Sequence, residues 1–163
     1  MSLISPAARA AAGRLLAAAG AGVEDPLAAA ERASADLGHV LTRWFGSYGT
    51  HALLTRALAR VRPDHAVLAA VRVRGPREPV LEGVTDVAPV HGVAATVEGV
   101  TAVLAAAVDL LGRMIGEDMA LHLVERSMEG SMPTVPDPSD PSLAPPNAPP
   151  DAPGATARAE GGS

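Results

Sequence analysis

The sequence predicts an all-α fold: a bundle of four main helices made by two pseudo-repeated helical hairpins, preceded by an N-terminal helix. Three observations support this prediction. Apolar residues recur at spacings of three and four along most of the first 129 residues. Glycine and proline stand where such helices would begin and end. The stretch 40–57, VLTRWFGSYGTHALLTRA, is echoed by 110–127, LLGRMIGEDMALHLVERS.

The first two helices are predicted from Ser-Pro and Asp-Pro pairs. Ser5 and Asp25 each supply a capping side chain directly before a proline, which is well tolerated in the first turn of a helix. We expect an alanine-rich helix from about 5 to 19 and a second helix from about 26 to 45. An apolar stripe marks the second helix. The stripe consists of Leu37, Val40, Leu41, Trp44 and Phe45.

Gly46 suits a left-handed C-terminal cap, so the second helix should stop there. A third helix is expected to begin at Ser47 or Thr50 and to end just before Pro63. Between 64 and 85 the pattern changes. In AVRVR apolar and basic residues alternate with period two, and the following GPRE is typical of a turn. With PVLEGV after it, this segment predicts a small β-hairpin insertion that packs on the helices.

Helical spacing returns from about Val87 to Ile115, as one continuous helix with an apolar seam. The seam consists of Val93, Val97, Val100, Leu104, Ala107, Leu111 and Met114. Gly116 should end this helix. Glu117 and Asp118 should start the last one, because acidic side chains favour the positive end of a helix dipole.

The chain divides into a helical domain, 1–129, and a tail, 130–163. The tail holds nine prolines and almost no large apolar side chain, so burial cannot offset the entropy of ordering it. Its net charge is −3, which leaves only −2 of the total −5 for the helical domain. We therefore expect a disordered, acidic, proline-rich tail.

The echo at 40–57 and 110–127 contains five identities among eighteen pairs, including Gly46 with Gly116 and Leu41 with Leu111. Each copy reads as a long amphipathic helix, a glycine turn and a shorter helix folding back. One such hairpin cannot hide its apolar stripe, whereas two packed face to face can. This predicts a four-helix core with pseudo-twofold symmetry. The alternative is that the two stretches are similar only because both contain the residues that commonly begin and end helices.

Composition limits the chemistry. The chain has no cysteine, which excludes disulfides, thiolate metal sites and a cysteine nucleophile. It has one Trp, one Tyr and one Phe, so the core must consist of Leu, Val, Ala and Met. Such a thin core would gain from a partner chain. The alanine excess and the absence of lysine are typical of a GC-rich bacterial genome.

The charge balance and the apolar runs argue against nucleic-acid and membrane partners. A net charge of −2 on the helical domain gives no general attraction to nucleic acid or to an anionic bilayer. Arg9 and Arg14 interrupt the N-terminal stretch where a signal peptide would be apolar. The most apolar run, Gly99 to Val108, is about half of what a membrane span needs. We expect a cytoplasmic protein.

His122 is the most suggestive single residue. Asp118 precedes it by one helical turn, a spacing at which a carboxylate can orient an imidazole, and phosphotransfer histidines also lie on helical bundles. The sequence ALHLVERS lacks the basic and small residues that usually follow such a histidine. No ATP-binding glycine loop occurs either. A surface histidine that pairs with Asp118 is the simpler interpretation.

A carboxylate–histidine pair and a group of arginines are two further candidate sites. Asp36 and His39 have the carboxylate-x-x-His spacing of bundle metal sites, but the equivalent repeat positions hold Ala106 and Asp109, so we expect no metal and no cofactor. Arginines concentrate between 56 and 77, where they could bind an anion or an acidic partner segment, the chain's own tail included. This group is Arg56, Arg60, Arg62, Arg72, Arg74 and Arg77.

No complete catalytic set is present: there is no nucleophile elbow, no P-loop and no dinucleotide fingerprint. The sequence therefore favours a non-catalytic helical interaction or scaffold module, with a protein partner or a second copy of itself. The alternative is a bacterial signal-transduction component, either a phosphotransfer protein that uses His122 or a helical bundle that senses a small ligand.

Overall fold

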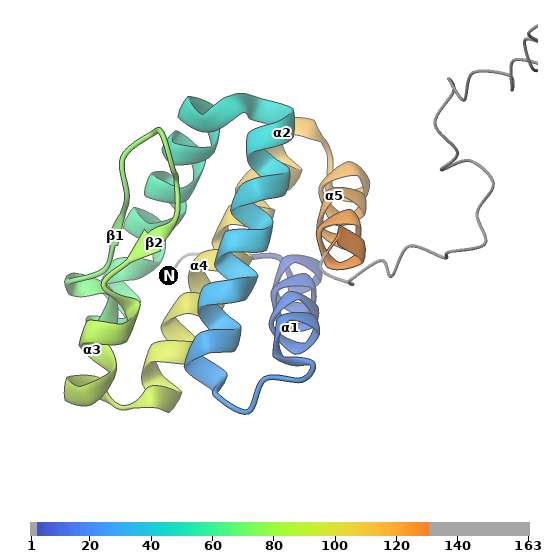
Figure 1. Cartoon of the computed structure of the whole chain (residues 1–163). Coiled ribbons are helices and arrows are strands. Elements are labelled where there is room, and N and C mark those ends of the chain that lie inside the picture. The colour runs from blue at the N-terminus through green and yellow to red at the C-terminus, as the bar shows by residue number, and fades with distance from the viewer. Residues whose placement is uncertain (1–2, 131–163) are drawn as a thin grey trace, which may run out of the picture. The chain divides into compact units, whose positions relative to one another are not determined.

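The computed structural model describes residues 3–130, which form five α-helices, two short 3-10 helices and one two-stranded sheet (Figure 1). The mostly helical fold predicted from the sequence is confirmed. The predicted tail, 130–163, lies outside the described residues except for Gly130. Its disorder therefore stays a prediction.

The two capped helices begin where the sequence predicts. Helix α1 spans Pro6–Gly20, and the Ser5 hydroxyl accepts a hydrogen bond from the Ala8 amide at 3.1 Å. Helix α2 spans Pro26–Val61, and the Asp25 carboxylate accepts one from the Leu27 amide at 2.9 Å. Both side chains satisfy an amide that the first helical turn leaves unpaired.

Gly46 divides α2 into two arms, 26–45 and 47–61, which fold back on each other (Figure 1). Its φ of 71° and ψ of 169° belong to a region that glycine alone adopts readily. Because the break occurs at the predicted residue, the two arms are the second and third helices predicted from the sequence.

The segment after α2 contains the predicted hairpin. Two 3-10 helices, Arg62–Asp64 (η1) and Ala66–Ala69 (η2), lead into strands β1 (Arg72–Val73) and β2 (Leu81–Glu82). The strands are antiparallel, with Arg72 opposite Glu82 and Val73 opposite Leu81. The hairpin is confirmed, with only two residues in each strand.

The predicted continuous helix from 87 to 115 is wrong at Gly92. There the chain breaks into α3 (Val84–His91) and α4 (Val93–Ile115). Gly92 has φ 88° and ψ 148°, and its amide donates to the Ala88 carbonyl at 2.8 Å, which ends α3. Apolar residues keep their helical spacing on both sides of Gly92, so the sequence pattern did not indicate the break, which depends on the backbone conformation of this one residue.

Gly116 ends α4 and separates it from α5 (Glu117–Gly130), as predicted. Glu117 and Asp118 occupy the first turn of α5. The turn between α4 and α5 lies at the same end of the fold as the Gly46 break, the upper end in Figure 1. Helix α2 contacts both α4 and α5.

One continuous apolar core joins the helices, and it consists of Leu, Val and Ala. Leu41 and Leu111, the paired residues of the echo, are both buried in it. The expectation that methionine fills the core is wrong for the described residues: Met114 and Met119 are 66% and 50% exposed, and Met128 is only half-buried. Leucines therefore provide most of the large buried side chains.

Two members of the predicted apolar stripes also face outward at the helix ends. Trp44 is 60% exposed and Val93 is 43% exposed. Both lie within two residues of a helix-breaking glycine, where the stripe runs past the edge of the core. Helical spacing predicts which face a residue occupies but does not show where the packed layer ends.

Helix α4 is buried along most of its length. It is the one helix among residues 3–130 that is long and apolar enough to cross a membrane, and the central helix of a packed core meets the same criteria. Most of its most apolar stretch is buried inside the fold. Its composition is therefore accounted for by its position between the other helices.

Candidate functional site

Asp109 holds the strongest polar cluster of the described residues. It lies in α4 among apolar neighbours, and its side chain is 6% exposed. Its Oδ1 accepts a hydrogen bond from the Ser5 amide at 2.9 Å, and its Oδ2 accepts one from Arg60 Nη1 at 2.7 Å and one from Arg113 Nε at 3.0 Å. We call Ser5, Arg60, Asp109 and Arg113 the Asp109 clamp.

The electrostatics of the clamp favour the ionised carboxylate. Burial acts to raise the pKa of Asp109, but the Ser5 amide and the guanidinium groups of Arg60 and Arg113 outweigh it, so the pKa lies below its ordinary value of 3.8. Both carboxylate oxygens accept hydrogen bonds from other parts of the chain. Asp109 is thus suited to hold elements together.

The clamp joins three parts of the chain. Arg60 comes from the second arm of α2, Asp109 and Arg113 from α4, and Ser5 from the start of α1. Arg60 also donates from Nη2 to the Leu3 carbonyl at 2.9 Å. The N-terminal segment is therefore held at two backbone groups.

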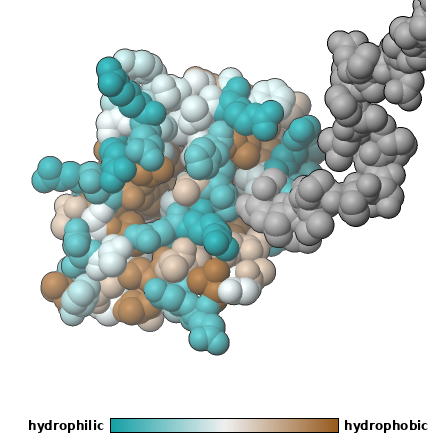
Figure 2. All heavy atoms as spheres, in the orientation of Figure 1, coloured by the Kyte–Doolittle hydropathy of each residue, from teal (hydrophilic) through white to brown (hydrophobic). Residues whose placement is uncertain are grey.

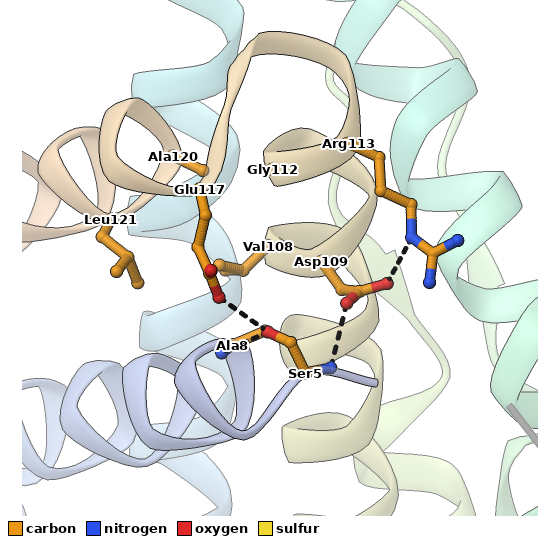
Figure 3. Close-up of a pocket in the computed structure, with 9 residues that line it drawn as sticks. All are labelled: Ser5, Ala8, Val108, Asp109, Gly112, Arg113, Glu117, Ala120 and Leu121. Atoms are coloured by element: carbon orange, nitrogen blue, oxygen red, sulfur yellow. Dashed lines mark hydrogen bonds and ion pairs between the residues drawn. The ribbon is translucent and has the colours of Figure 1, made fainter. Parts of the chain in front are cut away.

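A cavity of about 240 Å³ lies beside the clamp, between α1, α4 and the start of α5 (Figure 3). In it the Ser5 hydroxyl donates to Glu117 Oε1 at 3.1 Å. That hydroxyl also caps α1, so it is not a free nucleophile, and no histidine is among the lining residues. The two acids that line the cavity are Glu117 and Asp109, and Asp109 is held by the clamp.

A second hollow lies between the first arm of α2 and the end of α5. It has a volume of about 430 Å³ and is lined by Val40, Arg43, Trp44, Arg126 and Glu129. We call it the Trp44 groove. It brings Arg43 and Arg126 together, and no hydrogen bond or ion pair within residues 3–130 involves either guanidinium. The groove therefore presents an indole beside two unpaired cations.

The two glycine turns expose large apolar side chains. Trp44 and Tyr48, the chain's single tryptophan and tyrosine, flank Gly46 and are 60% and 77% exposed. Met114 and Met119 flank the turn at Gly116. We call Trp44, Tyr48, Met114 and Met119 the turn surface. In the view of Figure 2, apolar atoms gather in several areas between polar side chains.

The six arginines predicted as one patch do not act alike. Arg60 binds Asp109, and Arg62 donates to the carbonyls of Leu68 at 3.2 Å and Val71 at 2.7 Å. Arg74 forms ion pairs with Glu78 and Glu82, which raise its pKa further. The remaining three are exposed, and a binding role for them stays a prediction. They are Arg56, Arg72 and Arg77.

The histidine sites show no special geometry. His122 and Asp118 are both exposed on α5, and no hydrogen bond is found between them. Asp36 is half-buried and His39 is exposed, and no group of three or more potential metal ligands gathers within residues 3–130. Phosphotransfer through His122 stays a prediction.

Sequence reasoning missed Asp109, which it treated only as the border of an apolar run and the repeat equivalent of His39. A signal was present, because Asp109 interrupts AAAVDLLG, where apolar residues occupy every side of the helix. A charge at such a position needs a partner. The identity of the partners was hidden, because Arg60 is 49 residues away in the sequence.

Comparison with known proteins adds no relative: no protein-family profile, curated protein sequence or solved structure matches this chain.

Proposed function

We propose that this protein is a non-catalytic helical interaction module that associates with a second copy of itself through the turn surface. The observation that supports the proposal most directly is the exposure of Trp44 and Tyr48. Large aromatic side chains normally contribute their area to a core or to an interface. Here leucine, valine and alanine fill the core, and both of these aromatics remain outside it.

The proposal includes a true internal repeat that forms a pseudo-twofold four-helix bundle. Between 40–57 and 110–127, sixteen of eighteen paired positions share the same degree of burial, the exceptions being Ser47 with Glu117 and Gly49 with Met119. The two turn glycines also have similar backbone angles, φ 71° and ψ 169° at Gly46 and φ 97° and ψ 145° at Gly116. Two equivalent turns at one end supply two similar apolar surfaces side by side.

Charge favours a second copy as the partner. No acidic residue occurs between Asp36 and Asp64, so the turn at Gly46 and the second arm are basic, with Arg43 exposed three residues before the turn and Arg56 exposed farther along that arm. Helix α5 exposes the acids instead. They are Glu117, Asp118, Glu125 and Glu129. In an isologous dimer the basic turn of one copy faces the acidic helix of the other, and the same contact occurs twice.

The available area is adequate. An aromatic side chain buries roughly 150–250 Å², and a dimer would bring four aromatics and four methionines together. They would supply a substantial part of the roughly 1,200–2,000 Å² buried in a stable interface. Methionine also packs favourably against aromatic rings. We place this module in the cytoplasm, and it needs no cofactor.

Size-exclusion chromatography with light scattering tests the proposal. We expect the wild type to run at twice the monomer mass, with the monomer appearing on dilution. The double variant Tyr48→Ser, Met119→Ser should dimerise at least tenfold more weakly. Val90→Ser is the matched control, because Val90 is 78% exposed but lies on α3. A wild type that stays monomeric up to its solubility limit would refute self-association.

A further inference from the structure

The Trp44 groove has the chemistry of a peptide site. One wall is an indole, and two guanidinium groups that have no partner among residues 3–130, those of Arg43 and Arg126, stand beside it. Glu129 also lines the groove and leaves the net charge of the lining at +1. Arginine binds carboxylates through paired, charge-assisted hydrogen bonds. The groove therefore suits an extended segment that alternates flat apolar surface with carboxylates.

The chain carries such a segment shortly after α5 in the sequence. Residues 133–141 read PTVPDPSDP, with prolines at 133, 136, 138 and 141 and acids at Asp137 and Asp140. Proline-rich sequences favour the polyproline II conformation before they bind, so docking orders them at a low entropic cost. Aromatic-lined grooves are the usual receptors for such segments.

We propose that residues 133–141 of the same chain dock in the Trp44 groove. Prolines would pack on the indole of Trp44, and Asp137 and Asp140 would pair with Arg43 and Arg126. The site and the segment have opposite charges, and neither guanidinium of the groove has a hydrogen bond or ion pair within residues 3–130. The inference does not rest on the proposed self-association, because it concerns the side of Trp44 that faces α5.

The length of the chain favours its own segment over a segment from another molecule. Glu129 lines the groove and Gly130 ends α5. From there to Asp137 the chain can extend about 3.3–3.6 Å per residue, roughly 23–25 Å in all. A segment linked to its site by a few residues of the same chain also has an effective concentration of about millimolar, so a contact too weak to hold two separate molecules together can still form.

The single tryptophan makes the test direct, since its fluorescence comes from the groove alone. We would measure tryptophan emission and acrylamide quenching of the full chain at a concentration where light scattering finds only monomer. If the wild type dimerises at every usable concentration, all variants would be made in the double variant Tyr48→Ser, Met119→Ser. Asp137→Asn, Asp140→Asn should move the emission maximum to longer wavelength and raise the quenching constant. High salt should do the same to the wild type.

Two matched controls define the site. The double variant Asp151→Asn, Glu160→Gln removes two carboxylates that follow α5 at a greater separation in the sequence, and it should leave the emission unchanged. Arg43→Gln, Arg126→Gln should reproduce the effect of losing the acids, whereas Arg9→Gln, Arg14→Gln, which removes two exposed cations of α1, should not. Glu129→Gln should lower the quenching constant below that of the wild type, because it removes the one repulsive charge.

Equal quenching of the wild type and of Asp137→Asn, Asp140→Asn would overturn the inference. Protection of Trp44 that grows with protein concentration would overturn it too, since it would come from association between chains. That second result would leave the proposed self-association intact. Conversely, protection of Trp44 in the monomer that is lost in Asp137→Asn, Asp140→Asn would support tail docking, and the proposed self-association would still be decided by light scattering at higher concentration.

Discussion

Arg60 and Asp109 meet at 2.7 Å although they are 49 residues apart in the sequence. The Arg60 side chain is 18% exposed and that of Asp109 is 6% exposed, so their contact is largely shielded from water. It ties the second arm of α2 to the centre of α4 and, through the Ser5 amide, to the start of α1. A thin core of small side chains is thereby reinforced by a polar crosslink.

Replacing Asp109 with Asn should lower the free energy of unfolding by about 2–4 kcal/mol, because Arg60 loses the carboxylate that it contacts at 2.7 Å in a position shielded from water. Urea denaturation followed by circular dichroism would measure this. Arg113→Gln is the matched control, since its side chain is 62% exposed, and it should lose less than about 1 kcal/mol. Equal losses in the two variants would contradict a central role for the Arg60–Asp109 pair.

The clamp should also make stability depend on pH. Because the folded pKa of Asp109 lies below its ordinary value of 3.8, its ionic contribution is fully present above that value. The contribution disappears as the pH falls from there through the folded pKa. The difference in urea midpoint between wild type and Asp109→Asn should stay constant from pH 7 to about 5 and shrink below about 4. A difference that grows in acid would mean that the carboxylate is not stabilised.

The turn glycines should resist substitution for a reason of backbone conformation. Nothing lies within 4 Å of a Cβ built on Gly46 or Gly116, but both have positive φ. Gly46→Ala and Gly116→Ala should each lower the stability by about 1–3 kcal/mol. Gly13, equally uncrowded but inside helix α1, should show the opposite sign, with Gly13→Ala raising stability by about 0.5–1 kcal/mol. Thermal melts would distinguish these outcomes, and stabilisation by Gly46→Ala would argue against the break in α2.

Gly99 should be intolerant for a different reason, the close packing of η2 on α4. A Cβ at Gly99 would lie 2.8 Å from Val67 Cγ1 and 3.2 Å from Leu68 Cδ2. Gly99→Ala should lower the stability by about 1–3 kcal/mol through overpacking. The double variant Gly99→Ala, Val67→Ala should recover part of this loss, since it removes the nearest methyl group. No recovery would show that the crowding lies elsewhere.

His122 is exposed, and no hydrogen bond within residues 3–130 orients its imidazole, so we expect no phosphotransfer through it. Incubation with radiolabelled phosphodonors, comparing wild type with His122→Gln, should give the same acid-labile label in both proteins. Label that depends on His122 would establish the signal-transduction alternative and would contradict a purely non-catalytic module.

The sequence alone determined where most helices begin and end, because those limits depend on local chemistry. Ser5, Asp25 and the glycines at 46 and 116 act on their own neighbouring amides and dihedrals, and each was predictable. Gly92 escaped prediction, because apolar residues at helical spacing continue on both sides of it. The identity of the neighbouring residues does not indicate that Gly92 adopts a positive φ.

Only the tertiary structure decided which polar and aromatic side chains find partners. The pairing of Asp109 with Arg60, the separation of the six arginines and the convergence of Arg43 with Arg126 all join residues that are far apart in the sequence. Trp44 looked like a core residue by its spacing, yet it lies where the helix passes the end of the packed layer. Periodicity reports the face of a helix, whereas partners and depth depend on how the helices are arranged in space.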